Sequence, residues 1–384
     1  MLFDIPKIEP FQFKIKVLQH LIFSNYCDLL QKGCSNFGAH CMIRIFGKNP
    51  SGAHKLRIQN SPNYKGNAFE NRTPTTMLAE DASYWQMVRE LIGGAKGRMP
   101  TQPLPVKVSD VYAPGAGIHI QWFGHSSYLL TIDGFRILVD PVLSGNASPI
   151  PGSIKAFKGV DVFTPAQLGK IDLLLLTHDH YDHLDYKTVV AMNNQVAKVV
   201  CSLGVASHLY YWGYAQDKIT ELDWWESAQI NGALRLTAAP ARHFSGRSLN
   251  RAQTFWSSFV LQTPRGNIYL GGDSGYDDHF KEIGQKYSGF ELAILECGQY
   301  NEKWPHIHMQ PEQTVQAAVD LKAKVLMPVH WGKFALAYHP WKEPIQRAKK
   351  EAERLGMPLL VSHLNERVEV TTHHPLVEWW EIIQ

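Results

Sequence analysis

The chain has 384 residues, of which 45% are hydrophobic and 19% are charged, and its formal net charge is +3. This composition excludes a disordered chain, because it supplies enough apolar surface for one large core or two modest ones. The five cysteines are an odd number without paired spacing, which excludes a disulfide scaffold and makes a reduced, cytoplasmic compartment the expectation.

The first 66 residues are expected to form an N-terminal extension. Residues 1–66 hold nine Lys/Arg residues against three Asp/Glu residues, whereas the remainder of the chain holds 29 against 32. Such a basic segment either contacts an anionic surface such as a phospholipid membrane or is simply solvated, and the second case is the more common. No stretch of the chain reaches the ~20 apolar residues that a membrane-spanning helix needs. The membrane contact that we consider is therefore a peripheral one.

A helix and a linker are expected over residues 67–114, packing on the main domain. Thr75 or Thr76 can cap the helix, and the glycine pair at residues 93–94 ends it. Three prolines between residues 100 and 105 then predict an extended linker.

Residues 115–384 are expected to form one α/β (α+β) catalytic domain. Strands that first follow one another and later alternate with helices indicate a sheet-rich body with outer helices. The expected strands lie at residues 118–130 (two strands around a turn), 135–139, 171–176, 198–201, 234–239, 255–263, 267–271, 290–295 and 324–329. The expected helices lie at about residues 186–193, 204–213, 277–287, 311–322 and 343–355.

The stretch with the densest chemistry follows the apolar run at residues 171–176 and reads Thr177-His178-Asp179-His180-Tyr181-Asp182-His183. Such a run is typical of a strand buried on both faces, and polar side chains at its end need partners because unpaired polar groups are costly to bury. Imidazole and carboxylate groups at this density suit zinc, and manganese and iron tolerate the same ligands. One short loop can therefore face two metal ions, whereas the simpler alternative is a polar strand end with surface histidines.

Three later residues, His243, Asp273 and His330, follow predicted strands in the same way. Taken alone, each has an ordinary explanation as a hydrogen-bonded polar residue or part of a turn. Together with the first loop, they are typical of a site that several strand ends assemble at one edge of a sheet. The sequence therefore predicts seven metal ligands, namely His178, His180, Asp182, His183, His243, Asp273 and His330.

This order and spacing of ligands resembles the metallo-β-lactamase superfamily, over about residues 115–372. The resemblance implies a four-layer αββα sandwich, which is the metallo-β-lactamase fold, with a binuclear centre at its edge and two Zn²⁺ ions as the cofactors. It also implies an assignment of the ligands: one ion is held by His178, His180 and His243, the other by Asp182, His183 and His330, and Asp273 bridges them.

Further segments resemble the branch of the superfamily that contains N-acyl-phosphatidylethanolamine-hydrolysing phospholipase D. They are Gly124-His125-Ser126-Ser127, Asp140-Pro141-Val142, Leu222-Asp223-Trp224-Trp225, His243-Phe244-Ser245, His308-Met309-Gln310-Pro311 and His330-Trp331-Gly332-Lys333. Bacterial ascorbate-6-phosphate lactonase is a more distant relative. One departure concerns Ile307, which stands where the phospholipase usually carries a polar residue.

The resemblance implies a zinc-dependent hydrolase, a phosphodiesterase of phospholipase D type that cleaves N-acyl-phosphatidylethanolamine to N-acylethanolamine and phosphatidic acid. Two metal ions would lower the pKa of a shared water, which Asp182 and Asp273 would orient. His308 would donate a proton to the leaving group or stabilise the phosphoryl oxygens, and the alternative is an ordinary surface histidine.

Three further residues are candidates for support of the metal ligands or for substrate contact. Asp140 either holds a ligand histidine or is only a turn residue. His125 is a candidate for the same support or for the wall of the pocket. Trp331 is a candidate wall residue of an apolar groove for acyl chains, although most tryptophans belong to a core or a surface patch.

Two rival functions are compatible with the sequence. One is a lactonase that acts on a sugar phosphate at the same metal ions, and the other is a non-catalytic metal-binding module, against which stands the presence of every ligand. The slightly acidic main domain predicts no nucleic-acid partner. The expected partner is a phospholipid or another small phosphorylated substrate, in the cytoplasm or at the membrane surface, and the oligomeric state stays open.

Overall fold

The computed structural model describes residues 44–79, 96–248, 250–371 and 376–383, and two mixed β-sheets form the centre of this part of the chain. The larger sheet has the order β15-β3-β4-β5-β6-β7-β8. Its strands are β3 (Ile118–Trp122), β4 (Tyr128–Ile132), β5 (Phe135–Val139), β6 (Ile171–Leu176), β7 (Val196–Ser202), β8 (Ile219–Leu222) and β15 (Arg367–Glu369). The second sheet has the order β14-β13-β12-β11-β10-β9. Its strands are β9 (Ser227–Gln229), β10 (Arg235–Ala239), β11 (Ser258–Thr263), β12 (Gly266–Leu270), β13 (Leu292–Glu296) and β14 (Leu326–Val329).

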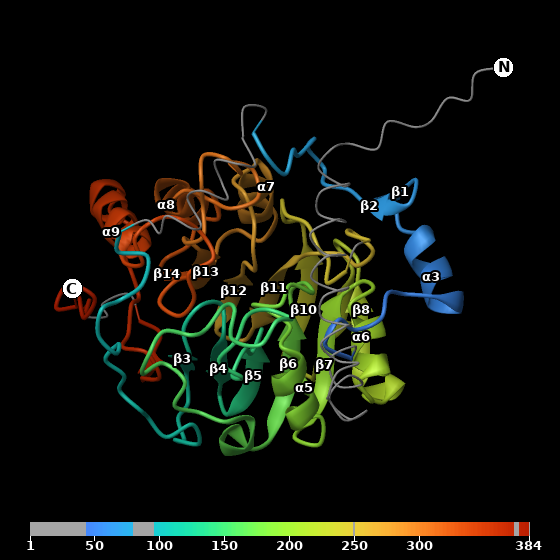
Figure 1. Cartoon of the computed structure of the whole chain (residues 1–384), viewed down its shortest axis with the longest axis horizontal. Helices are drawn as coiled ribbons and strands as arrows, with labels where there is room; N and C mark the ends of the chain where they lie inside the picture. The colour runs from blue at the N-terminus through green and yellow to red at the C-terminus, as the bar shows by residue number, and fades with distance from the viewer. Residues whose placement is uncertain (1–43, 80–95, 249, 372–375, 384) are drawn as a thin grey trace, which may run out of the picture.

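Helices cover the outer faces of the two sheets, which gives the described chain four layers. Figure 1 shows α7, α8 and α9 on one side of the strands and α5 and α6 on the other. The helices are α5 (Tyr186–Met192), α6 (Ala206–Tyr211), α7 (His279–Lys286), α8 (Pro311–Asp320) and α9 (Glu343–Leu355), with 3-10 turns at Pro165–Leu168 and Gln216–Lys218. The predicted αββα sandwich is therefore confirmed.

The hydrophobic core lies between the sheets and under the helices. Along β6, Leu173 and Leu175 pack into the cluster between the two sheets, whereas Leu174 and Leu176 pack against α5 and α6. Successive side chains of a strand point to opposite faces, so a strand covered on both faces is apolar throughout. Burial of each such leucine contributes roughly 1.5–3 kcal/mol relative to exposure.

The directions of the strands bring several carboxyl ends to one edge of the sandwich. In the larger sheet β3, β5 and β6 share one direction, because β4 is antiparallel to both β3 and β5, and β5 is parallel to β6. In the second sheet β10, β12, β13 and β14 share one direction for the same kind of reason. Polar residues that follow these strands can therefore meet.

The strands and helices predicted for residues 115–384 are present, with bounds that differ by a few residues. Three short strands, β8, β9 and β15, were not predicted. Strands β9 and β15 have three residues each and a single apolar side chain, which is too little for a period of two to stand out. Pairing with longer neighbours, not local sequence, makes these segments strands.

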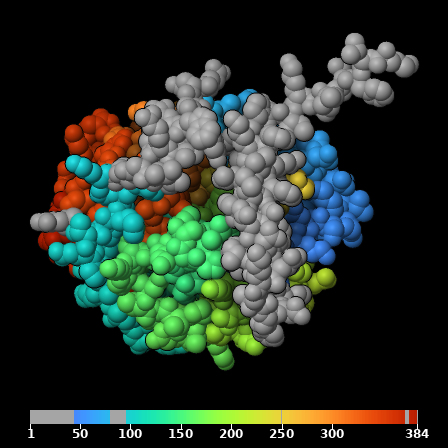
Figure 2. All heavy atoms as spheres, in the orientation of Figure 1, coloured from blue at the N-terminus to red at the C-terminus, as the bar shows by residue number. Residues whose placement is uncertain are grey.

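The described part of the N-terminal extension packs on the main domain. Helix α3 (Gly52–Gln59) buries Ile58 in a cluster with Phe69 and Phe255, and β1 (Tyr64–Lys65) pairs with β2 (Ala68–Phe69). The blue surface of this segment borders the yellow-green surface of α6 in Figure 2. Its structure was not predicted, because the segment contains many turn formers and α3 has little amphipathic pattern.

Two expectations fall on other parts of the chain. The helix predicted from Thr75 lies largely at residues 80–95, outside the described residues. Residues 1–43, which are part of the extension (residues 1–66) predicted to contact a membrane, also lie outside them. Within the described ranges, the helices lack the combination of length and apolar character that crossing a membrane requires.

Candidate metal centre

All seven predicted ligands meet at the edge where the strands end. Four come from the loop after β6, and single residues follow β10, β12 and β14. Their side chains form two groups, and the ligand atoms within each group lie within 4.8 Å of one another.

The first group consists of His178, His180, His243 and Asp273. His180 Nδ1 lies 2.9 Å from His178 Nε2 and 3.2 Å from His243 Nε2. Asp273 Oδ2 lies 3.7 Å from Nε2 of both His178 and His243. Three imidazole nitrogens and a carboxylate oxygen thus surround one point, which is the geometry of a single metal ion's ligands.

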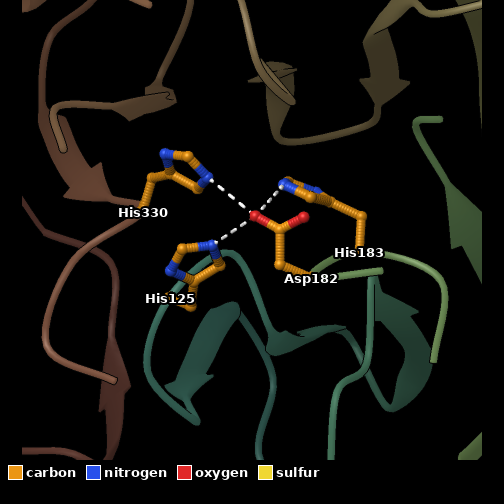
Figure 3. A group of neighbouring side chains, drawn as sticks. All are labelled: His125, Asp182, His183 and His330. Carbon is orange, nitrogen blue, oxygen red and sulfur yellow. Dashed lines mark hydrogen bonds and ion pairs between the residues drawn. The ribbon is translucent and has the colours of Figure 1, made fainter. Parts of the chain in front are cut away.

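The second group consists of His125, Asp182, His183 and His330 (Figure 3). Asp182 Oδ2 lies 2.9 Å from His125 Nε2, 3.4 Å from His330 Nε2 and 3.7 Å from His183 Nε2. His125 was predicted to support the ligands or line the pocket, and the structure places its ring nitrogen directly on the Asp182 carboxylate.

Asp273 joins the two groups. Its Oδ2 also lies 3.1 Å from His183 Nε2 and 3.3 Å from His330 Nε2. Its Oδ1 is buried without a hydrogen-bond partner among the described residues, and the same is true of His183 Nε2. Buried polar atoms rarely lack partners, so these atoms point to a bound cation.

The electrostatics of the buried site fit divalent ions. Burial lowers the pKa of His178 and His243 well below the ordinary range and that of His180 to about 4, so these rings are neutral and offer lone pairs. Burial also lowers the pKa of His330, but Asp273, Asp182 and Glu296 outweigh this and raise it to about 10. These three carboxylates therefore favour a positive charge at this position, which a bound metal ion would supply.

Asp140 supports the ligands from behind. Its Oδ2 accepts a hydrogen bond from His183 Nδ1 at 2.8 Å, and its carboxylate also accepts from the backbone N–H and the hydroxyl of Thr177. The first contact leaves His183 Nε2 facing the metal centre, as an outer carboxylate does for a metal-bound histidine.

Three non-glycine residues of the site have positive φ, namely His125 (53°), Asp140 (40°) and His330 (68°). Residues other than glycine are strained in this region, at a cost of about 1–3 kcal/mol each. All three side chains contact candidate metal ligands, and such strain concentrates at functional sites.

Glu296 is a site residue that the sequence analysis missed. It ends β13, its side chain is fully buried, and its Oε2 lies 2.9 Å from Nδ1 of His308. The available signal was a charged residue directly after the apolar run of residues 292–295. His308 itself, which the sequence placed near the substrate, lies beside the metal ligands, with ring centroids 5.1 Å from His330 and 5.0 Å from His243.

Trp331 does not line the pocket. It packs in the core against Trp122, Trp379 and Trp380, and its indole N–H donates to the Pro328 carbonyl. The expectation that it forms an acyl groove is therefore wrong, because the side chain points to the opposite face of the chain from His330. Its backbone carbonyl accepts the N–H of His125 and so helps to hold that loop.

Asp179 lies inside the metal-binding loop but points away from the two ligand groups. Its Oδ2 accepts from Thr254 Oγ1 at 2.8 Å and lies 3.1 Å from His208 Nε2. His208 Nδ1 in turn accepts the N–H of Lys48. This buried network ties the loop to α6 and to the described start of the chain.

A cavity of about 210 Å³ opens beside the two ligand groups. It combines metal-facing and apolar side chains, namely His180, Asp182, Phe244, Asp273, Gln299, Trp304, Ile307, His308, His330 and Leu336. A ligand with a polar head and an apolar portion suits such a lining.

The family described as beta-lactamase superfamily domain matches residues 135–331, a segment that contains all seven predicted ligands. An uncharacterised protein of Mycobacterium tuberculosis is 40% identical over 340 residues, which cover 84% of this chain and 88% of that protein. The chain belongs to the beta-lactamase superfamily. It is a metal-dependent hydrolase of this superfamily, and the His/Asp groups are able to bind metal.

Two further comparisons concern the branch of the superfamily and the fold. The mitochondrial N-acyl-phosphatidylethanolamine-hydrolyzing phospholipase D of Saccharomyces cerevisiae is 31% identical over 266 residues, which cover 65% of this chain and 55% of that protein. The structure of a metallo hydrolase from Ignicoccus hospitalis matches with a TM-score of 0.51 at 22% identity, covering 65% of this chain and 97% of the other. The latter likeness shows the fold, and the former confirms the resemblance to the phospholipase branch.

Proposed function

We propose that this hydrolase cleaves the phosphodiester bond of N-acyl-phosphatidylethanolamine and releases N-acylethanolamine and phosphatidic acid. The observation that carries the proposal is the position of Asp273 Oδ2, which lies 3.7 Å from His178 Nε2 in one group and 3.1 Å from His183 Nε2 in the other. A carboxylate between two groups of three ligands is typical of two-metal hydrolases of phosphate esters. The yeast relative supports the choice of substrate.

The ligands divide as the resemblance implies: His178, His180 and His243 for one ion, Asp182, His183 and His330 for the other, and Asp273 for both. Two divalent ions, with Zn²⁺ expected and manganese or iron tolerated, lower the pKa of a water and offset charge on phosphoryl oxygens when bound there.

His308 is the proposed proton donor in this reaction. The ring donates in its doubly protonated form, in which the Nδ1 hydrogen is bonded to Glu296 Oε2 and the Nε2 hydrogen is available to the substrate in the cavity. When the bond between phosphorus and the ethanolamine oxygen breaks, this oxygen takes a proton, and water adds to phosphorus in its place. Asp182 also lines the cavity, and the hydrogen bond from His125 Nε2 orients its carboxylate.

The apolar part of the cavity wall suits the hydrocarbon part of the substrate. Phe244, Trp304 and Leu336 line the cavity on this wall, and Ile307 stands beside His308. An apolar residue at position 307 gives the headgroup no hydrogen-bonding partner there, so we expect recognition of the acyl portion to dominate over recognition of the headgroup.

The test uses the full chain loaded with Zn²⁺ and vesicles that contain N-acyl-phosphatidylethanolamine. We expect equimolar N-acylethanolamine and phosphatidic acid, and a loss of kcat of at least about 100-fold in Asp182→Asn. Asp133→Asn is the matched control, because Asp133 is a surface residue that pairs with Arg265.

Three results would contradict the proposal. Turnover of a sugar-phosphate lactone without turnover of the phospholipid would identify a lactonase. Fewer than one tightly bound metal ion per chain would identify a non-catalytic binding module. Full activity in Asp182→Asn would remove Asp182 from the mechanism.

A further inference from the structure

Glu296 is held in one orientation by the backbone. Its Oε1 accepts hydrogen bonds from the N–H groups of Ser274 at 3.0 Å and Met309 at 3.2 Å. Its Oε2 lies 2.9 Å from Nδ1 of His308 and 3.4 Å from Nδ1 of His330, which also lies 3.3 Å from the Gly298 carbonyl. One fixed carboxylate oxygen therefore faces two imidazole rings that come from different loops.

The two rings compensate the buried charge. The ion pairs of the described residues give Glu296 only imidazole partners, and its side chain is fully buried. A carboxylate in this position is costly unless the facing nitrogens carry hydrogens. Glu296 thus favours a hydrogen on Nδ1 of both rings. This leaves the Nε2 lone pair of a neutral His330 for a metal ion, and it leaves the Nε2 hydrogen of a doubly protonated His308 for the substrate. Nε2 of His330 then faces Asp182 and Asp273, at 3.4 and 3.3 Å.

We propose that Glu296 is a positioning residue that places a hydrogen on Nδ1 of both His308 and His330 and fixes the orientation of the two rings. The effect on His330 concerns metal binding and needs no assumption about the substrate, whereas the effect on His308 rests on the proposed phosphodiesterase function. Glu296 does not line the cavity, so it acts through the groups that it contacts and not on the substrate.

The same atoms have a second interpretation. One ligand atom from each of Asp273, Glu296, His308 and His330 lies within 4.8 Å of the others, so a third cation can be imagined here. The two backbone N–H groups on Oε1 and the hydrogen-bonding distance to His308 Nδ1 favour the positioning role. The number of bound metal ions separates the two interpretations.

The test replaces the carboxylate by an amide of the same shape, Glu296→Gln. If the amide oxygen keeps the two backbone N–H groups, the amide NH₂ faces both Nδ1 atoms and disfavours a hydrogen on either. His308 then loses the doubly protonated form that donates, and His330 keeps only the Gly298 carbonyl, at 3.3 Å, as an acceptor for its Nδ1 hydrogen. The matched control is Glu291→Gln, because Glu291 precedes the same strand and pairs with Lys324 at the surface.

Metal binding is measured first, by chelator competition on protein loaded with Zn²⁺ and by the visible spectrum of the Co²⁺-loaded protein. We expect Glu296→Gln to lower the affinity for one of the two ions by about 10- to 100-fold and to change the Co²⁺ spectrum. The affinity for the other ion, and both affinities in the Glu291→Gln control, should stay unchanged. Unchanged metal affinity would overturn the proposal for His330. Three ions in the wild type and two in the variant would overturn it in favour of a third metal site.

Kinetics then test His308, with the natural phospholipid and with a phosphodiester that releases nitrophenol. Nitrophenolate needs no proton donor, so Glu296→Gln should lower kcat for the phospholipid at least 10-fold more than for the nitrophenyl ester, with KM unchanged. His308→Gln should show the same selectivity, and the double variant should lose no more of it than His308→Gln alone. Equal losses on both substrates would overturn the proposal for His308.

Failure of the proposed function is a separate result, in which the wild-type protein does not hydrolyse the phospholipid. The metal-affinity measurements would still test the role of Glu296 towards His330. If Glu296→Gln does not fold, Glu296→Asp replaces it. This variant keeps the charge but is one methylene shorter, so it should show the same losses in smaller amounts, and wild-type metal affinity in it would overturn the proposal.

Discussion

At the scale of single residues, the site depends on groups that orient the ligands. Asp140 shows this best, because one carboxylate holds both His183 Nδ1 and the Thr177 backbone at the end of β6. Burial raises the pKa of Asp140 above its ordinary value, while His183 and Thr177 act to lower it. The residue is therefore coupled to the charge of the centre that it supports.

Asp140→Asn tests this coupling. The amide cannot serve His183 and Thr177 as two acceptor oxygens, so we expect metal affinity to fall by about 10- to 100-fold while the fold is retained. Asp172→Asn is the control, because Asp172 lies at the opposite end of β6 and accepts the N–H of Arg136. The measurement is metal retained against a chelator, and equal retention in both variants would contradict the role.

The ligand residues were predictable because their chemistry is visible in the sequence. The residue types and spacing of His178, His180 and Asp182 are enough to predict a metal site. Glu296 was not predictable in the same way, because its role depends on the distance to His308, twelve positions away, and to His330 on the next strand. The prediction for Trp331 was wrong because its side chain packs in the core, on the opposite side of the chain from His330.

At the scale of elements, one buried lysine fastens the loops around the site. Lys333 Nζ donates to the carbonyls of Phe123 at 3.2 Å and Val142 at 2.8 Å, and it pairs with Asp161 at 2.8 Å. These contacts join the loop that carries His330 to the loops after β3 and β5. The Lys333 ammonium therefore helps to fix the positions of His125, Asp140 and His330.

Lys333→Met should destabilise the protein by about 3 kcal/mol, because it leaves two carbonyls and one carboxylate without their partner. Lys324→Met is the matched control, since Lys324 pairs with Glu291 at the surface and should change stability by less than about 1 kcal/mol. Denaturant unfolding of both variants measures the difference. Similar losses in the two variants would show that Lys333 does not fasten the loops.

At the scale of the whole molecule, the metal centre joins the two sheets. Ligands after β6 belong to one sheet, and those after β10, β12 and β14 belong to the other. The start of the described chain is fastened to the same loop, since Arg247 donates to the carbonyls of Asp179 and Ile45. Metal binding should therefore stabilise the entire sandwich and not one loop.

Removal of metal by a chelator should lower the thermal unfolding midpoint, and added Zn²⁺ should restore it. A ligand that binds only the folded state stabilises it by about 4 kcal/mol at a thousand times its Kd. Asp273→Ala should show a much smaller shift, because it removes the carboxylate shared by both groups. An equal shift in this variant, measured by calorimetry with and without chelator, would contradict the bridging position of Asp273.

The longer strands, the residue types that follow them and the superfamily were predictable from the sequence, because these depend on local patterns: apolar runs and dense imidazole and carboxylate groups. Only the tertiary structure decided which atoms face one another. The order β14-β13-β12 places Glu296 beside His330, the loops from both sheets place His125 on Asp182, and Asp179 turns away towards His208. Those pairings follow from long-range strand order and strained loop backbones, and neither is encoded in the spacing of neighbouring residues.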